Sequence, residues 1–100
     1  MSQQLLSSTA QSTTGSVELE YSHNMNLSYT QMRSLYCWGT LGGATVHLDA
    51  SPDNGTTWVS AAQITSSNFD TVLAVQIRAT KVRGRVAGGD GTTSVNMTIL

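Results

Sequence analysis

Two histidines and one cysteine are the first side chains of this sequence that could do chemistry. His47 lies between Thr45 and Asp49 in an alternating run and could act as a general base if a nucleophile lay beside it, but the pattern identifies none. His23 lies far away in a polar stretch, and nothing in the sequence supports a metal pair between the two histidines. Cys37 lies in an apolar run, where a small buried thiol is a commoner interpretation than an activated nucleophile.

The carboxylates are equally weak candidates for catalysis. Glu18 and Glu20 are about 7 Å apart on one face of a predicted strand, a spacing compatible with a glycosidase pair but ordinary for an exposed strand. A calcium loop needs several oxygen ligands, and beside the one carboxylate of Asp53 the sequence offers only hydroxyl and amide groups, those of Ser51, Asn54 and Thr56. We therefore predict a non-enzymatic protein with no catalytic residue, no metal and no cofactor.

A predicted hairpin turn positions Asp53. The sequence Ser-Pro-Asp-Asn-Gly-Thr-Thr-Trp at 51–58 follows an alternating run at 44–50, which is typical of a strand. Proline presets φ at the start of a turn, Asp and Asn side chains accept hydrogen bonds from nearby backbone donors, and Gly55 supplies a residue with positive φ. The segment therefore predicts a β-hairpin.

The same segment is similar to the Asp-box, a hairpin motif with the pattern S-x-D-x-G-x-T-W. Every specified position matches, at Ser51, Asp53, Gly55, Thr57 and Trp58. The resemblance implies that these residues hold a hairpin together away from any active site, so we assign them a structural role. Sialidase-type propellers repeat the motif blade after blade, whereas this chain carries one copy in 100 residues, which excludes a propeller.

Composition favours a single all-β domain. The chain has 100 residues, enough for one modest core, and its many Ser and Thr residues favour turns and strands over long helices. Charged residues make up 11% of the chain and the formal net charge is −1, so no long-range field would draw it to nucleic acid or to an anionic membrane. We therefore expect neither of these partners.

The N-terminal residues and the cysteine content bear on where the protein is made and what stabilises it. Residues 1–7 lack a basic segment followed by a long apolar stretch, so we expect neither a signal peptide nor a transmembrane helix and place synthesis in a cytoplasm. Cys37 has no second cysteine with which to form an internal disulfide or a thiolate metal site. Stability must then come from packing or from partners.

Short runs of alternating apolar and polar residues predict roughly seven or eight strands. The clearest lie at 16–21, 35–41, 44–50, 57–62, 73–79, 82–86 and 94–100. The stretch 23–34 is less regular and could be a strand or a long connection, and we favour a strand. Strands at this spacing indicate a single antiparallel β-sandwich over 16–100, either jelly-roll or immunoglobulin-like, with the strand order left open.

Two surface features are candidates for a partner interface. Residues 1–15 are rich in Ser, Thr and Gln, with Leu5 and Leu6 as the only bulky apolar pair, and we interpret them as an extended arm that a neighbouring subunit would hold. The second feature is a basic stripe on neighbouring strands, formed by Arg78, Lys81, Arg83 and Arg85. The stripe is either a solvated sheet face or an interface for acidic side chains of a partner. Nucleic acid is a weaker candidate, because binding it would require aromatic residues between the basic ones for stacking on the bases, and the stripe has none.

Segments 42–58, 82–86 and 91–95 together resemble small structural proteins of tailed bacteriophages, and the resemblance covers roughly the last two thirds of the chain. It implies a virion component, for which we favour a capsid decoration or cement protein. The partners would be the major capsid protein or other virion subunits, with many copies per particle or a homo-oligomer. The arm would add a strand to an exposed sheet edge of a neighbour, and the basic stripe would fix the register.

Two alternatives remain open for the function. A neck, tail or fibre component would share the fold and differ in copy number and location within the virion. A carbohydrate-binding β-sandwich module would expose aromatic residues as a sugar platform, drawn from Trp38, Trp58, Tyr21, Tyr29 and Tyr36. In a small sandwich such residues usually pack in the core, so their exposure separates the two kinds of function.

Overall fold

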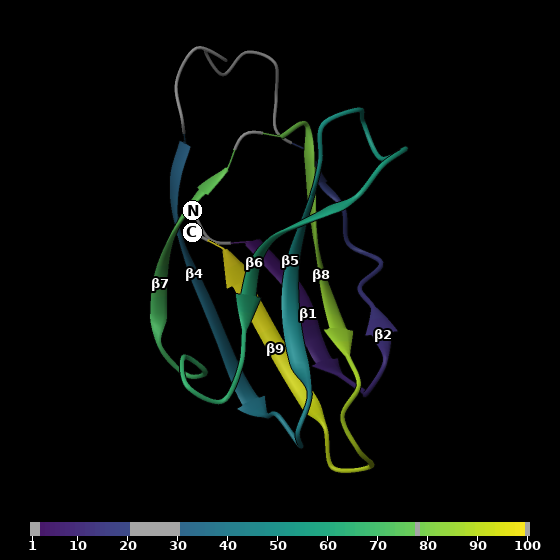
Figure 1. The fold of residues 1–100 in the computed structure, drawn as a ribbon, viewed down its shortest axis with the longest axis vertical. Coiled ribbons are helices and arrows are strands. Elements are labelled where there is room, and N and C mark those ends of the chain that lie inside the picture. The colour runs from purple at the N-terminus through teal and green to yellow at the C-terminus, as the bar shows by residue number, and fades with distance from the viewer. Residues whose placement is uncertain (1–2, 21–30, 78, 100) are drawn as a thin grey trace.

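The computed structural model describes residues 3–20, 31–77 and 79–99, and within these ranges it contains strands, turns and loops but no helix, hence none that could span a membrane (Figure 1). The all-β prediction is confirmed. The strands are β1 (Gln3–Thr9), β2 (Thr13–Thr14), β3 (Leu19–Glu20), β4 (Gln31–Thr40), β5 (Thr45–Ser51), β6 (Val59–Ile64), β7 (Val72–Ile77), β8 (Lys81–Ala87) and β9 (Ser94–Ile99). Of the predicted strand at 23–34, residues 23–30 lie outside the described part of the chain.

The strands form two antiparallel sheets that pack face to face as a sandwich. Sheet A has the order β1-β9-β4-β7, and sheet B has the order β2-β8-β5-β6, with β3 pairing beside β2 on the same strand, β8. Counting β2 and β3 as two parts of one strand position gives eight positions, within the predicted number. The core between the sheets holds the buried apolar residues of both.

The strand pairs are nested, and this settles the strand order. The hairpin β5–β6 lies innermost in the sequence, β4–β7 encloses it, the pairs of β2 and β3 with β8 enclose that, and β1–β9 is outermost. The long hairpin is rolled so that β9 also pairs with β4 and β8 also pairs with β5. This is the order of a jelly roll rather than of an immunoglobulin domain.

Alternation along β8 shows why the sequence folds this way. Val82, Gly84 and Val86 are buried, whereas Lys81, Arg83 and Arg85 alternate with them on the outer face of sheet B. The same period of two buries Val95, Met97 and Ile99 on β9. Burying an aliphatic side chain of this size contributes about 1.5–3 kcal/mol, so each strand commits one face to the core.

The N-terminal residues correct our prediction of an arm. Residues 3–9 form β1 and pair with β9, and both Leu5 and Leu6 are only 2% exposed in the core. Neighbouring residues of a regular strand face opposite sides, but the ladder shifts register between Gln4 and Leu6, which accompanies the burial of both leucines. Leu5 and Leu6 are therefore core residues and not part of a partner interface.

Leu6 fits against a strand of the opposite sheet because that strand has a glycine there. A Cβ atom added at Gly84 would lie 2.7 Å from Leu6 Cγ, and one added at Gly15 would lie 2.7 Å from Leu6 Cδ2. Both distances are shorter than side chains tolerate, so the two glycines make room for the leucine. Polar composition concealed this strand, because an edge strand with one solvated face needs few apolar residues.

Candidate functional site

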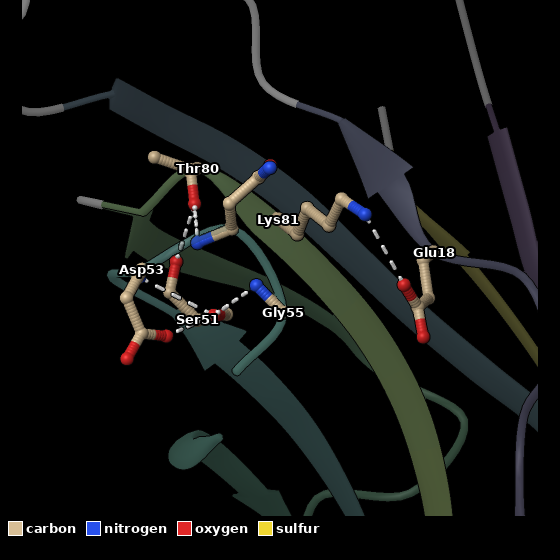
Figure 2. Close-up of polar contacts among 7 residues, drawn as sticks. Glu18, Ser51, Asp53, Gly55, Thr80 and Lys81 are labelled. Carbon is tan, nitrogen blue, oxygen red and sulfur yellow. Dashed lines mark hydrogen bonds and ion pairs between the residues drawn. The ribbon is translucent and has the colours of Figure 1, made fainter. Parts of the chain in front are cut away.

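Hydrogen bonds inside the β5–β6 turn involve two side chains of the Asp-box pattern (Figure 2). Ser51, which is buried at the end of β5, accepts a hydrogen bond of 2.7 Å from the Gly55 N–H through its Oγ atom. The Ser51 hydroxyl donates to Asp53 Oδ1 at 3.0 Å, and the same carboxylate oxygen accepts the Thr57 N–H at 2.7 Å. Asn54 and Gly55 take the positive φ angles of 63° and 99° that the turn requires.

Thr80, which the sequence analysis did not single out, ties this turn to the link between β7 and β8. Its N–H and its hydroxyl both donate to the Ser51 carbonyl, at 2.8 and 3.0 Å, and its Oγ1 accepts the Asn54 N–H at 2.8 Å. Nothing in the local sequence pattern marks this contact, because the partners lie 26 and 29 residues apart. The turn is therefore held both by hydrogen bonds among its own residues and by hydrogen bonds to Thr80.

Asp53 is held as an acceptor and not as a catalytic acid. Hydrogen bonds from the Thr57 backbone, first, and then from its hydroxyl lower the pKa of Asp53 below its ordinary value. A general acid needs the opposite shift, toward neutral pH. Asp53 therefore stays ionised at neutral pH, where its charge strengthens the hydrogen bonds of the turn.

A buried carboxylate paired with two arginines lies on the outer face of sheet B. Asp49 on β5 is 2% exposed although it points away from the core, because two arginines of β8 cover it. Arg85 binds it in a bidentate manner, with Nε 2.8 Å from Oδ2 and Nη2 3.2 Å from Oδ1. Arg83 Nε lies 3.5 Å from the same Oδ2.

Trp58 completes this group, which we call the Asp49 cluster (Asp49, Trp58, Arg83 and Arg85). The Arg83 guanidinium carbon lies 4.1 Å from the centre of the Trp58 ring, so that arginine contacts both a carboxylate and an aromatic face. The hydrogen bond to Asp49 is the main reason that the pKa of Arg85 is raised. Trp58 is thus half-buried within the cluster and does not stand as a free aromatic platform.

His47 does have a hydroxyl beside it, a neighbour that the sequence pattern did not reveal. Its Nδ1 lies 2.9 Å from Ser60 Oγ on β6. The ladder skips Ala61, so that Ser60 comes opposite Asp49 on the same face as His47. Only knowledge of this bulge could have paired the two residues.

Within the described residues, the His47–Ser60 pair is not arranged as part of a hydrolytic triad. Burial, followed by the charge of Arg85, lowers the pKa of His47, while Asp49 partly opposes the shift. A neutral imidazole suits a general base, but the nearby carboxylate of Asp49, which would orient the imidazole in a triad, is bound by two arginines. Ser60 itself is exposed on an edge strand, so we assign the pair no catalytic role.

The predicted basic stripe is largely paired with acids of the same chain. Lys81 Nζ lies 3.4 Å from Glu18 Oε1, and both arginines of β8 contact Asp49. Figure 2 shows the Lys81 and Glu18 side chains pointing toward each other. Arg78, the fourth member, lies outside the described residues. The three described cations do share the outer face of β8 as predicted, but they offer little unbalanced charge to an acidic partner.

An uncharged aromatic group lies on the outer face of sheet A, and we call it the aromatic patch (Tyr36, Trp38 and Val72). The rings of Tyr36 and Trp38 stack with centroids 5.1 Å apart and an interplanar angle of 16°. Val72 pairs with Tyr36 across β4 and β7 and is 61% exposed. The Tyr36 hydroxyl donates a hydrogen bond of 2.6 Å to Asp70 Oδ1, which is the main reason that the pKa of Tyr36 is raised.

No family model, no curated protein and no solved structure matches this chain. The assignment of function therefore depends on the sequence pattern and on the geometry of the site.

The two further candidates for chemistry are the thiol of Cys37 and a metal site built from His, Cys, Asp or Glu side chains. Burial raises the pKa of Cys37 to about 12, so its thiol stays protonated and unreactive at neutral pH. Within 3–20, 31–77 and 79–99, no three His, Cys, Asp or Glu side chains form a group that could hold a metal ion. His23, Tyr21 and Tyr29 lie outside those ranges.

Proposed function

We propose that this protein is a non-enzymatic structural component of a tailed-bacteriophage virion and that it decorates and stabilises the assembled capsid. The resemblance of segments 42–58, 82–86 and 91–95 to small phage structural proteins motivates the virion assignment. The jelly roll is compatible with it, since this architecture is common in viral capsids, although it also occurs in lectins and enzymes.

The main observation that favours a binding role over an enzymatic one is that the reactive side chains are engaged in contacts within the fold or buried. Asp53 is engaged in a turn, Asp49 is engaged by two arginines and Cys37 is buried. On the outer face of sheet A, the described residues include the aromatic patch, which is partly exposed and whose side chains make a polar contact through the hydrogen bond from Tyr36 to Asp70. Half-exposed aromatic side chains are the residues that most often dominate the free energy of protein interfaces.

The aromatic patch replaces the arm and the basic stripe as the proposed contact with the capsid. The arm residues 3–9 belong to the sandwich, and the described residues of the basic stripe, Lys81, Arg83 and Arg85, have acidic partners. A protein that binds the assembled shell but not its free subunits stabilises the shell by mass action. Repetition over many sites would let a modest contact at each site have a large total effect.

Co-sedimentation of the purified protein with phage particles or empty capsids tests the proposal. We expect saturation on the order of hundreds of copies per particle, the stoichiometry of a repeated surface lattice. Trp38→Ala should weaken the binding, whereas His47→Ala on the opposite sheet should leave it unchanged. Saturation at a handful of copies would place the protein at the neck or tail instead, and an absence of binding would remove the virion function.

Carbohydrate binding is a second candidate, and the stacked pair of Tyr36 and Trp38 is the observation that favours it. Aromatic faces on a sheet stack against sugar rings, and Asp70 beside Tyr36 supplies a polar group of the kind that orients a ligand. Iodide quenching of tryptophan fluorescence tests it. A sugar that binds this pair should protect Trp38 from quenching, and Trp38→Ala should abolish that protection while Trp58 still reports on the cluster of sheet B.

A further inference from the structure

The four edge strands of the sandwich differ in how well they are protected from pairing with another chain. Sheet A ends in β1 and β7, and sheet B ends in β6 on one side and in β2 with β3 on the other. An edge strand exposes unpaired N–H and C=O groups, and proteins protect such edges with bulges, short strands, charged residues or proline. Three of these edges carry such a device.

Irregularities interrupt the edges at β1 and β6. The β1–β9 ladder shifts register twice, between Gln4 and Leu6 and again between Leu6 and Thr9. The β5–β6 ladder shifts once, where Ala61 is the extra residue. The remaining edge of sheet B consists of two strands of only two residues each. None of these edges offers a long regular row of backbone groups.

Strand β7 has none of these devices. It runs for six residues, Val-Leu-Ala-Val-Gln-Ile, with no charged residue and no proline. Its ladder with β4 is unbroken from the pair Gln31–Ile77 to the pair Tyr36–Val72. Its other side pairs with no strand in the described part of the chain, and Figure 1 shows it at the outer edge of sheet A. Val72 and Ala74 on this strand are exposed.

We infer that β7 pairs with β7 of a second copy of this chain, antiparallel across a two-fold axis. The strand is complementary to itself because it holds no charge that would face its own copy. Registers centred on Ala74 or on Val75 bring residues of the same face opposite each other, so the apolar inner faces of the two copies stay aligned. The formal net charge of −1 gives little repulsion between copies.

Such pairing would join the two copies of sheet A into one continuous eight-stranded sheet. Each aromatic patch includes Val72 of β7, so the pairing of the two β7 strands would also bring the two patches onto a single surface. One pair of six-residue strands buries less area than a standard interface of about 1,600 Å², so we expect a dissociation constant between about 1 µM and 1 mM. This inference does not depend on the proposed virion function.

Sedimentation equilibrium of the purified protein over that concentration range tests the inference with a matched pair of variants. Ala74→Lys places two like charges near each other across the two-fold axis and should raise the dissociation constant of the dimer at least about tenfold. Ala61→Lys adds the same charge at an exposed alanine of the bulged edge β6 and should leave it unchanged. Circular dichroism and thermal melting of both variants establish that each is folded.

Amide hydrogen exchange shows whether β7 is the contacting strand. In the native chain, protection of residues 72–77 should rise as the protein concentration rises, while protection of β6 stays constant. Three results would overturn the inference: a monomer throughout the range, an equal response of the two lysine variants, or a dimer whose β7 amides exchange at a rate independent of concentration.

Discussion

At the scale of single residues, Asp49 shows how a carboxylate becomes buried on the outside of a sheet. Two arginines lie over it and a tryptophan lies over one of them, so water reaches little of it. Removing one charged side chain of such a group leaves a buried opposite charge without its counter-charge, which destabilises the fold. The arginines keep some exposure to water, which reduces that penalty.

We expect Asp49→Asn to lower the free energy of unfolding by about 1–3 kcal/mol, since the amide cannot neutralise either arginine. Urea unfolding measures the change. Glu18→Gln is the control, because it removes the partly exposed ion pair with Lys81 and should cost no more than about 1 kcal/mol. Equal effects of the two substitutions would show that the Asp49 cluster adds nothing beyond a surface ion pair.

The pKa of His47 predicts how stability changes with pH. Because burial and Arg85 lower the pKa of His47 below 6.5, the unfolded chain takes up a proton there before the folded one does. The contribution of His47 to stability is therefore complete above pH 6.5 and is lost as the pH falls toward its folded pKa. Unfolding free energies measured between about pH 5 and pH 7 should show this slope, and His47→Gln should remove it.

His23→Gln is the matched control for the pH series. His23 lies outside the described residues, and we assign the slope to His47 alone, so His23→Gln should keep the slope of the native chain. A slope that survives His47→Gln but disappears in His23→Gln would reverse the assignment.

At the scale of elements, the sequence predicted those strands whose pattern is local. The alternation along β5, β8 and β9 and the turn chemistry at 51–58 are visible in the sequence because each depends on neighbouring residues. Strand β1 was not visible, because a register shift accompanies the burial of two consecutive leucines that alternation would separate. The Asp49 cluster was not visible either, because it depends on which residues of β5 and β8 come opposite each other.

The packing of β1 on β8 predicts a specific clash. Gly84→Ala should lower the free energy of unfolding by about 1–3 kcal/mol, because its Cβ would lie 2.7 Å from Leu6 Cγ. Gly91→Ala, where nothing lies within 4 Å of the added Cβ, should change stability by less than about 0.5 kcal/mol. Thermal or urea unfolding gives both values.

A double-mutant cycle identifies the clash itself. In a Leu6→Ala background the added methyl group at Gly84 has room, so Gly84→Ala should cost less there than in the native chain. Additive losses would mean that the cost arises from the backbone of β8 and not from contact with Leu6.

At the scale of the whole molecule, the outer faces of the two sheets have opposite character. Sheet B carries the Asp49 cluster and the His47–Ser60 pair, in which the described charges are satisfied within the chain. Sheet A carries the aromatic patch and ends in the unprotected strand β7. Both proposals place binding on sheet A, whereas the sequence alone pointed to the arm and the basic stripe, because burial of the leucines and pairing of the charges depend on the tertiary fold.

The nested strand order also governs when the fold can close. Strand β9 lies between β1 and β4 in sheet A, although it is the last strand along the chain. Until β9 is in place, β1 has no partner in its sheet and Leu5 and Leu6 lack their side of the core. We therefore expect a chain still being synthesised to stay open on this side, with the final step a slow, long-range closure on the millisecond-to-second scale that is typical of all-β domains.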